Sequence, residues 1–291
     1  MRLVLNLSAA GLLLLGLFGV FQVGYSFRPF NNAADDIVGK AESTFQARNQ
    51  FEYYEIIRIT EDNEVEKGGM LLIYEYEDEG VKGLWRITES SPDMPAATLL
   101  CLQPANGPAS LFLYEKESST AGRIEGIGKQ RTLSNTDWHL EDIYDNDKEA
   151  GRTFSREGNA VVQGEYVFKI RSRYTDPIMR RNSAYGEGTA YFTVDTKRFL
   201  RLELFDKSNQ LMKTIYPDNP INLGNAEEPR YRPRFIELIH HRQGTRTLLL
   251  LKKAVYNIEH AEDFFTPEHA AKWDASQDEA ILARLKPLSE Y

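Results

Sequence analysis

One short stretch of the chain, RFLRLELFDKSNQLMKTIY at residues 198–216, alternates apolar and polar side chains on both sides of a polar turn. Leu200, Leu202 and Leu204 fall on one side of an extended chain, and the alternation resumes at Leu211 after the turn at 206–209. A period of two with one apolar side is typical of a half-buried antiparallel strand. The stretch therefore predicts a hairpin whose apolar side packs against another part of the molecule.

Similar alternating runs, ended by Gly, Asn or Asp, recur along most of the chain and predict one large antiparallel sheet. Two stretches interrupt the series. Residues 90–109 hold four prolines and cannot be regular strand throughout. Residues 129–153 are polar, with a short helical turn expected at 138–143. The alternating runs lie at 51–60, 70–77, 84–90, 110–117, 165–174, 189–194, 234–242 and 245–258.

Helical patterns lie at the two ends of this series. Residues 33–48 carry apolar side chains four positions apart, which predicts an amphipathic helix. Thr266 ahead of a proline predicts a helix start. Ser276 and Glu279 have the spacing of a capping box, which predicts a further helix at 276–286. The fold class predicted is α+β, with helices packed against one face of the sheet.

The N-terminus has the pattern of a targeting segment. Arg2 is followed by an uncharged, largely apolar run that lasts until Arg28. This pattern predicts either a secretory signal cut after residue 26 or an uncleaved membrane anchor, since about 20 apolar residues suffice to cross a bilayer. Both interpretations place the remaining chain, 27–291, outside the cytoplasm as a single domain, which in a bacterium is the periplasm.

The sequence carries no motif for catalysis or metal binding. The formal net charge of −8 argues against a nucleic-acid partner. The single cysteine, Cys101, excludes an intramolecular disulfide. H-E-x-x-H, Cys-x-x-Cys, G-x-S-x-G, P-loop and dinucleotide fingerprints are missing, and the adjacent His240 and His241 point to opposite sides of a strand. The acidic stretch 142–149 lacks the glycine of a calcium loop and is interpreted as a solvated turn. We therefore predict a binding protein without metal, cofactor or enzymatic activity.

Five segments together, in the order in which they occur, resemble the LolA-like family of bacterial outer-membrane lipoprotein-sorting proteins. The proline-rich insert at 92–108 and the helix at 276–286 lie outside the pattern of that family. The segments are ADDIVGKAEST (34–44), 110–145 with Asp137, Trp138, Glu141, Asp142 and Ile143, 191–215 with Phe192, Asp195, Asp206 and Lys213, 231–257 with Pro233 and Thr247, and DFFTPEHA (263–270).

The resemblance implies an unclosed, strongly curved antiparallel sheet, a half-barrel, with helices covering its concave face. It also implies a hydrophobic cavity for the acyl chains of lipoproteins or lipids, an inner-membrane transporter that delivers them and an outer-membrane acceptor. In such a sheet one side of each strand faces the cavity. The candidate lipid-binding residues are Tyr54, Ile56, Leu111, Leu113, Phe192, Val194, Leu200, Leu202 and Leu204.

Three functions follow from these observations as hypotheses. The first is a non-enzymatic periplasmic carrier of acyl chains toward the outer membrane, since each buried methylene contributes about 0.8 kcal/mol and needs no directional chemistry. The second is a membrane-anchored accessory protein of an envelope transport complex that uses the same fold as a scaffold. The third is a hydrolase, which would require His139 or His240 to meet a serine and a carboxylate in a pocket.

Overall fold

The computed structural model describes most of the chain after the N-terminal segment. Of the predicted helix at 33–48, residue 34 and residues 36–38 are described as helical, while residue 48 is described as a bend ahead of the first strand. The expected targeting segment 1–26 and the acidic residues 144–149 lie outside the described residues. No helix in the described part is long and apolar enough to cross a membrane. The described residues are 34, 36–38, 48–78, 80–88, 93–104, 109–115, 121–143, 152–224 and 231–290.

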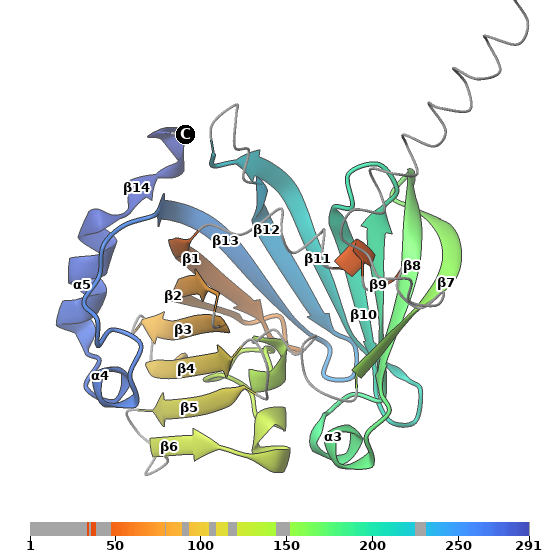
Figure 1. Cartoon of the computed structure of the whole chain (residues 1–291), viewed down its shortest axis with the longest axis horizontal. Helices are drawn as coiled ribbons and strands as arrows, with labels where there is room; N and C mark the ends of the chain where they lie inside the picture. The colour runs from red at the N-terminus through yellow and green to blue at the C-terminus, as the bar shows by residue number, and fades with distance from the viewer. Residues whose placement is uncertain are drawn as a thin grey trace, which may run out of the picture.

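The described strands form one antiparallel sheet that curls around a hollow without closing, as the resemblance implies (Figure 1). The order is β6-β5-β4-β3-β2-β1-β13-β12-β11-β10-β9-β8-β7, with β14 added to β13. The strands are β1 (Asn49–Ile59), β2 (Val65–Glu77), β3 (Gly80–Thr88), β4 (Ala97–Pro104), β5 (Ser110–Glu115), β6 (Ala121–Ile124), β7 (Arg152–Val162), β8 (Glu165–Tyr174), β9 (Glu187–Thr193), β10 (Phe199–Phe205), β11 (Leu211–Asn222), β12 (Tyr231–His240), β13 (Thr245–Tyr256) and β14 (Lys286–Pro287).

Short helices connect and cover the strands. The predicted turn at 138–143 is the 3₁₀ helix η2, and α3 follows β8 at one end of the sheet (Figure 1). The helical elements with assigned bounds are η1 (Gly126–Gln130), η2 (Leu140–Asp142), α3 (Pro177–Asn182), α4 (Pro267–Ala271), α5 (Ala275–Arg284) and η4 (Leu288–Glu290).

The two faces of the curled sheet bury different cores. On the inner face, apolar side chains from β1 to β5 and from β10 to β13 form one cluster with the segment 131–143. Trp138 of that segment lies 6.3 Å, ring centre to ring centre, from Trp85 of β3. The hydroxyl of Tyr74 donates to the carbonyl of Ile143 over 3.1 Å. The segment 131–143 therefore fills part of the hollow.

On the other, outer face, α4 and α5 cover the strands β1 to β5, whereas the resemblance implies helices over the concave face (Figure 1). Phe51, Leu71 and Leu84 pack there against Phe264 and Trp273 from the C-terminal region. Arg86 of β3 reaches the carboxylate of Asp278 on α5, with Nε 3.2 Å from Oδ1. These strands consequently have apolar side chains packed against both of their faces.

The structure confirms the predicted start of α4 but not the predicted start of α5. Thr266 caps α4, with its hydroxyl accepting from the amide of His269. The expected capping box of Ser276 and Glu279 is wrong, because α5 starts one residue earlier. The side chain of Asp274 accepts from the amides of Ser276 and Gln277 and so caps the helix.

We predict that the α5 helix depends on its buried ion pair with β3. The side chains of Arg86 and Asp278 are each only 7 % exposed, and the indole of Trp273 also donates to Asp278 over 2.7 Å. Asp278→Ala leaves a buried guanidinium without its partner and should lower the free energy of unfolding by about 3–5 kcal/mol. Urea denaturation measures this loss. The control is Glu279→Ala at an exposed neighbouring position, which should change the free energy of unfolding by less than about 0.5 kcal/mol. Equal effects of the two variants would contradict the prediction.

Candidate ligand-binding site

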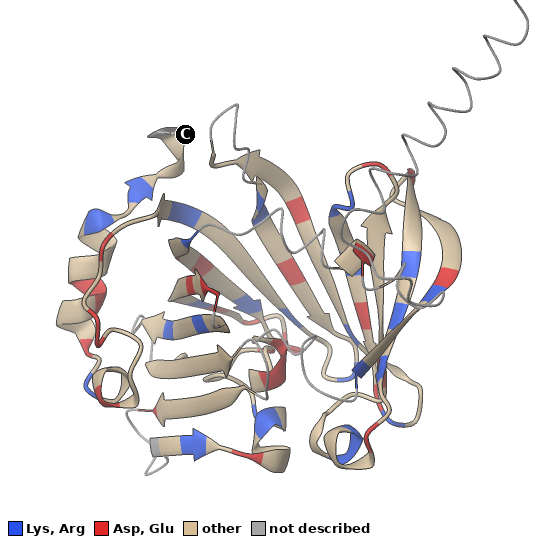
Figure 2. Ribbon diagram, viewed as in Figure 1, with Lys and Arg blue, Asp and Glu red and all other residues tan. Residues whose placement is uncertain are grey.

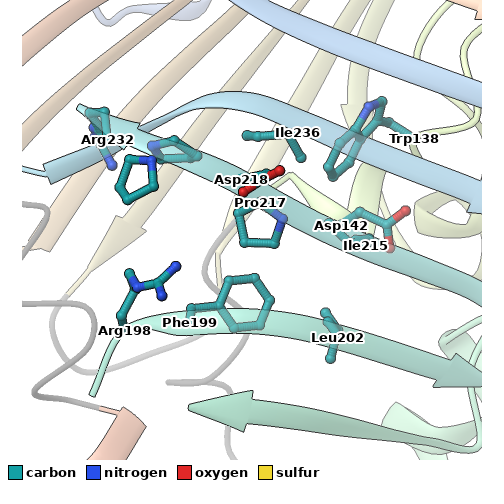
Figure 3. A pocket seen from close by; sticks show the side chains of 12 residues that line it. Trp138, Asp142, Arg198, Phe199, Leu202, Ile215, Pro217, Asp218, Arg232 and Ile236 are labelled. Carbon is teal, nitrogen blue, oxygen red and sulfur yellow. The ribbon is translucent and has the colours of Figure 1, made fainter. Parts of the chain in front are cut away.

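A pocket of about 300 Å³ opens on the inner face of the sheet, between β10, β11, β12 and the segment 131–143 (Figure 3). Its wall is largely apolar, with Phe199 and Leu202 on β10 and Ile215 on β11. Its volume lies at the lower end of the range for small-molecule sites. The lining residues are Trp138, Asp142, Arg198, Phe199, Leu202, Ile215, Pro217, Asp218, Pro220, Arg232, Pro233 and Ile236.

Two of the three prolines of the wall, Pro220 and Pro233, lie where β11 and β12 pair only with each other. β10 pairs with β11 between Leu202 and Phe205, and β13 pairs with β12 only from Phe235 onward. The ends of β11 and β12 beyond these points form a two-stranded extension in which Pro220 is opposite Pro233. Proline has no amide hydrogen and is tolerated in sheets at such edges. The extension therefore forms a pocket wall with few ladder hydrogen bonds.

Two arginines lie at one end of the pocket, away from Trp138 (Figure 3). Arg232 donates through Nε to the fully buried carboxylate of Glu52 over 2.8 Å. Burial alone would lower the pKa of Arg232, but the Glu52 carboxylate beside it raises that pKa overall, so the guanidinium stays charged. Arg198 donates through Nη2 to Glu165 over 2.6 Å. The pocket thus combines an apolar wall with a charged end.

The opposite end of the pocket rests on a buried polar cluster that fixes the segment 131–143. Lys213 of β11 is fully buried, and its ammonium donates to the carbonyl of Asp137 over 2.7 Å and to Oδ2 of Asp142 over 2.8 Å. The carboxylate of Asp137 accepts from the hydroxyls of Thr245 and Thr247 on β13 at 2.6 and 2.7 Å. The segment is therefore tied to β11 and to β13 by charge-assisted hydrogen bonds.

Burial and mutual charge shift the pKa values in this cluster in different directions. Burial opposes ionisation of Asp142, but the Lys213 ammonium lowers the pKa of Asp142 overall. Burial and the nearby Lys213 lower the pKa of His139 to about 4. Burial, reinforced by the Asp142 carboxylate, raises the pKa of Glu141 to about 7. Near neutral pH, Asp142 is therefore ionised beside Lys213, while His139 is neutral.

The polar cluster does not have the arrangement that the hydrolase hypothesis requires. His139 is stacked on Tyr185, whose hydroxyl donates to Oδ1 of Asp142 over 2.6 Å, and its ring lies 6.4 Å from that of His240. None of the hydrogen bonds between described residues joins a serine hydroxyl to either histidine. His139, Tyr185 and Asp142 are hydrogen-bonded to one another and to Lys213, and they support the segment 131–143. Nε2 of the buried His240 has no hydrogen-bond partner among the described residues.

The structure separates the nine predicted lipid-binding residues. Leu202 lines the pocket and packs against the inner core. Five others, Tyr54, Ile56, Leu111, Leu113 and Leu204, are buried within that core. Phe192 belongs to a cluster with the helical residues Ala34, Ile37 and Val38, and Val194 is half-buried just after β9.

Leu200 does not share a side with Leu202 and Leu204, contrary to the expectation from the alternation. It packs with Val167 and Tyr191 in a separate cluster. The cause is an irregularity of the β9–β10 register between Phe199 and Arg201. A bulge of one residue reverses the side on which a side chain lies.

Most of the pocket wall was not among the predicted site residues. Ile215 is opposite Leu202 in the β10–β11 ladder, so the pairing of the two alternating runs contains a signal for it. The three prolines are a further signal, because prolines within a predicted strand mark an edge or a special site. Trp138 had no such signal, since its position depends on how the segment 131–143 folds into the hollow.

The chain was compared with protein families, curated proteins and solved structures. Residues 80–270 match the model of a family described as "Uncharacterized protein". None of the curated proteins matches the sequence.

Three solved structures share the fold. A domain from Vibrio parahaemolyticus, proposed to be an outer membrane lipoprotein-sorting protein domain, superposes with a TM-score of 0.71 at 18 % identity over 83 % of this chain and 100 % of that one. A DUF1329 family protein from Desulfovibrio piger gives 0.69 at 14 % identity over 82 % and 98 % of the two chains. A LolA superfamily protein from Nitrosomonas europaea gives 0.61 at 17 % identity over 80 % and 97 %. The fold is therefore LolA-like, as the order of the sequence segments indicates.

We predict that Lys213 is required to hold the segment 131–143 in the hollow. Lys213→Met keeps the length of the side chain but leaves the buried Asp142 without its cation, and should lower the free energy of unfolding by about 3–5 kcal/mol in urea denaturation. The double variant Lys213→Met/Asp142→Leu removes both charges and should recover at least half of that loss. A double variant no more stable than the single one would contradict this role of the ion pair.

We also predict a pH dependence of stability that arises from Glu141. Because its pKa rises from an ordinary 4.5 to about 7 in the folded protein, the unfolded chain loses this proton first, and stability falls as pH rises between these values. Glu141→Gln keeps an oxygen for the amide of Ala184 and removes the titration. The stability of the variant relative to the original should rise by about 2 kcal/mol from pH 5 to pH 8.

Urea denaturation at several pH values measures the difference in free energy of unfolding between the variant and the original chain. Because His139 is present in both proteins, its titration cancels in this difference. The control is Glu125→Gln, which changes an exposed carboxylate and should show no pH trend. A Glu141→Gln difference that stays constant across the pH range would contradict the prediction.

Proposed function

We propose a function for this chain, which belongs to the family described as "Uncharacterized protein" and has the LolA-like fold: it is a non-enzymatic carrier that binds the acyl chains of lipids or lipoproteins. The observation that carries the proposal is the open pocket of about 300 Å³ on the inner face of the sheet. Its wall of Phe199, Leu202, Ile215 and Ile236 offers apolar contact along three neighbouring strands. An acyl chain gains about 0.8 kcal/mol for each methylene that such a wall removes from water.

Binding rather than catalysis is favoured by the chemistry around the pocket. At one end of the pocket, Asp142 and Lys213 are paired with each other and support the segment 131–143. At the other end, Arg198 and Arg232 are paired with Glu165 and Glu52. Asp218 of the wall accepts from the amide of Asn219. Basic and acidic residues are interspersed over the sheet (Figure 2), so charge does not single out a binding face. An apolar wall with a charged end fits an amphiphile, whose chain and polar group need different surroundings.

An envelope location follows from the same proposal. The apolar N-terminal run has the pattern of a secretory signal or an anchor, and the solved structures with this fold include a proposed outer membrane lipoprotein-sorting domain. In this role the chain receives its ligand from an inner-membrane transporter and passes it to an outer-membrane acceptor. The accessory function remains as the second candidate if the N-terminal segment stays attached and the pocket stays empty.

The test is native mass spectrometry of the full chain expressed with its own N-terminus and isolated from a bacterial envelope, with an organic extract analysed beside it. We expect a co-purifying acyl species. The same protein should bind a fluorescent C16 fatty acid, and Leu202→Glu should weaken this binding at least tenfold, because it places a carboxylate against the acyl chain. Leu202 is only half-buried, so the fold should tolerate the change.

The matched control is Leu211→Glu, the same substitution on the same hairpin at an exposed position outside the pocket lining. It should leave the affinity unchanged. Equal loss in both variants would show that the effect is not specific to the pocket. A ligand-free mass together with no binding of the fatty acid would overturn the carrier function and direct attention to protein partners.

A further inference from the structure

The tip of the β7–β8 hairpin exposes two large apolar side chains. Val161 and Tyr166 are opposite each other in the ladder, and they are 61 % and 74 % exposed. The connection between the strands consists of Gln163 and Gly164 alone, both with positive φ (52° and 82°). Two such residues make the tight turn that continues the twist of a hairpin. The tip is therefore a short projection that presents a tyrosine and a valine to the surroundings.

These two side chains continue an apolar row that leads toward the pocket. Tyr166, Phe168 and Ile170 alternate along β8 and so lie on one side of the sheet. Phe168 and Ile170 belong to the cluster formed with the helical residues 34, 37 and 38, and Phe199 of the same cluster lines the pocket. The exposed tip, the cluster and the pocket thus follow one another on the inner face of the sheet.

Only a short stretch of chain separates the cluster beside the tip from the apolar N-terminal run. Residues 3–26 carry no charge, and seven residues separate Ser26 from Ala34, which is fully buried in that cluster. Eight residue steps span less than about 30 Å even when fully extended. When the run 3–26 is inserted in a bilayer, the cluster beside the hairpin is held within that distance of the membrane surface.

We propose that the β7–β8 tip contacts the lipid–water interface of a bilayer through Tyr166 and Val161. A tyrosine combines an apolar ring with a hydroxyl and favours this interface. Two side chains are too small a patch for a stable protein interface, which needs about 800 Å² on each partner, whereas a bilayer requires no complementary surface. The contact goes beyond the proposed carrier function; only its use in transferring a ligand into the pocket would rest on that function.

The experiment compares tryptophan at two exposed positions in the full chain. Tyr166→Trp reports on the tip, and Ile178→Trp is the control, because Ile178 is also 61 % exposed but lies on α3, which follows the other end of β8 (Figure 1). Each protein is reconstituted into vesicles of phosphatidylethanolamine and phosphatidylglycerol at 3:1, with or without bromine on the acyl chains. The unsubstituted chain, whose three tryptophans are buried, supplies the background.

We expect bromine near the headgroup to quench at least half of the fluorescence added by Tyr166→Trp and to leave that added by Ile178→Trp unchanged. No quenching in the Tyr166→Trp variant, or equal quenching in both variants, would overturn the proposal. A signal from Tyr166→Trp that changes only when other envelope proteins are added, without quenching by bromine, would also overturn it and would indicate a protein partner. Adding Leu202→Glu to Tyr166→Trp separates the two hypotheses, because loss of fatty-acid binding should leave the quenching intact.

Discussion

The buried ammonium of Lys213 connects the curved sheet to the segment that partly fills its hollow. A curved sheet presents an apolar inner face that has to be covered, and here the segment 131–143 does this without a long helix. An irregular segment can remain inside a protein only if its polar groups find partners there. Lys213 provides two of these contacts, and Thr245 and Thr247 provide two more through Asp137. The same segment contributes Trp138 and Asp142 to the pocket, so the shape of the pocket depends on this cluster.

The two halves of the sheet are supported differently, and the pocket lies beside the less supported half. Strands β1 to β5 have an apolar core on each face, one with the segment 131–143 and one with α4 and α5. The far ends of β11 and β12 pair only with each other. The pocket therefore lies between strands that pack on both faces and a two-stranded wall that pairs only with itself.

Alternation and segment order predicted the sheet well, while individual positions depended on features that a pattern does not contain. The run 165–174 coincides with β8 because its apolar side is regular. Strand β7 was not predicted, because its residues are mostly exposed at the edge of the sheet and carry no apolar period. Leu200 lies on the side of β10 opposite to the predicted one, because the β9–β10 register is irregular at this position. The pattern contains no signal for the full burial of Lys213, because lysine is rarely buried. The carboxylate of Asp142 and the carbonyl of Asp137, both from a distant segment, compensate for its burial.

The facing prolines have a mechanical consequence for the sheet. Where Pro220 is opposite Pro233, neither residue has an amide hydrogen to donate to the other strand. The amide of His241 donates to the carbonyl of Met212, which places Pro220 and Pro233, eight residues along the ladder, at a pair that would otherwise exchange two hydrogen bonds. Both of these bonds are missing, so fewer ladder hydrogen bonds oppose separation of β11 and β12 at this end than beside Lys213. The resistance of the two strands to separation therefore falls toward their free ends.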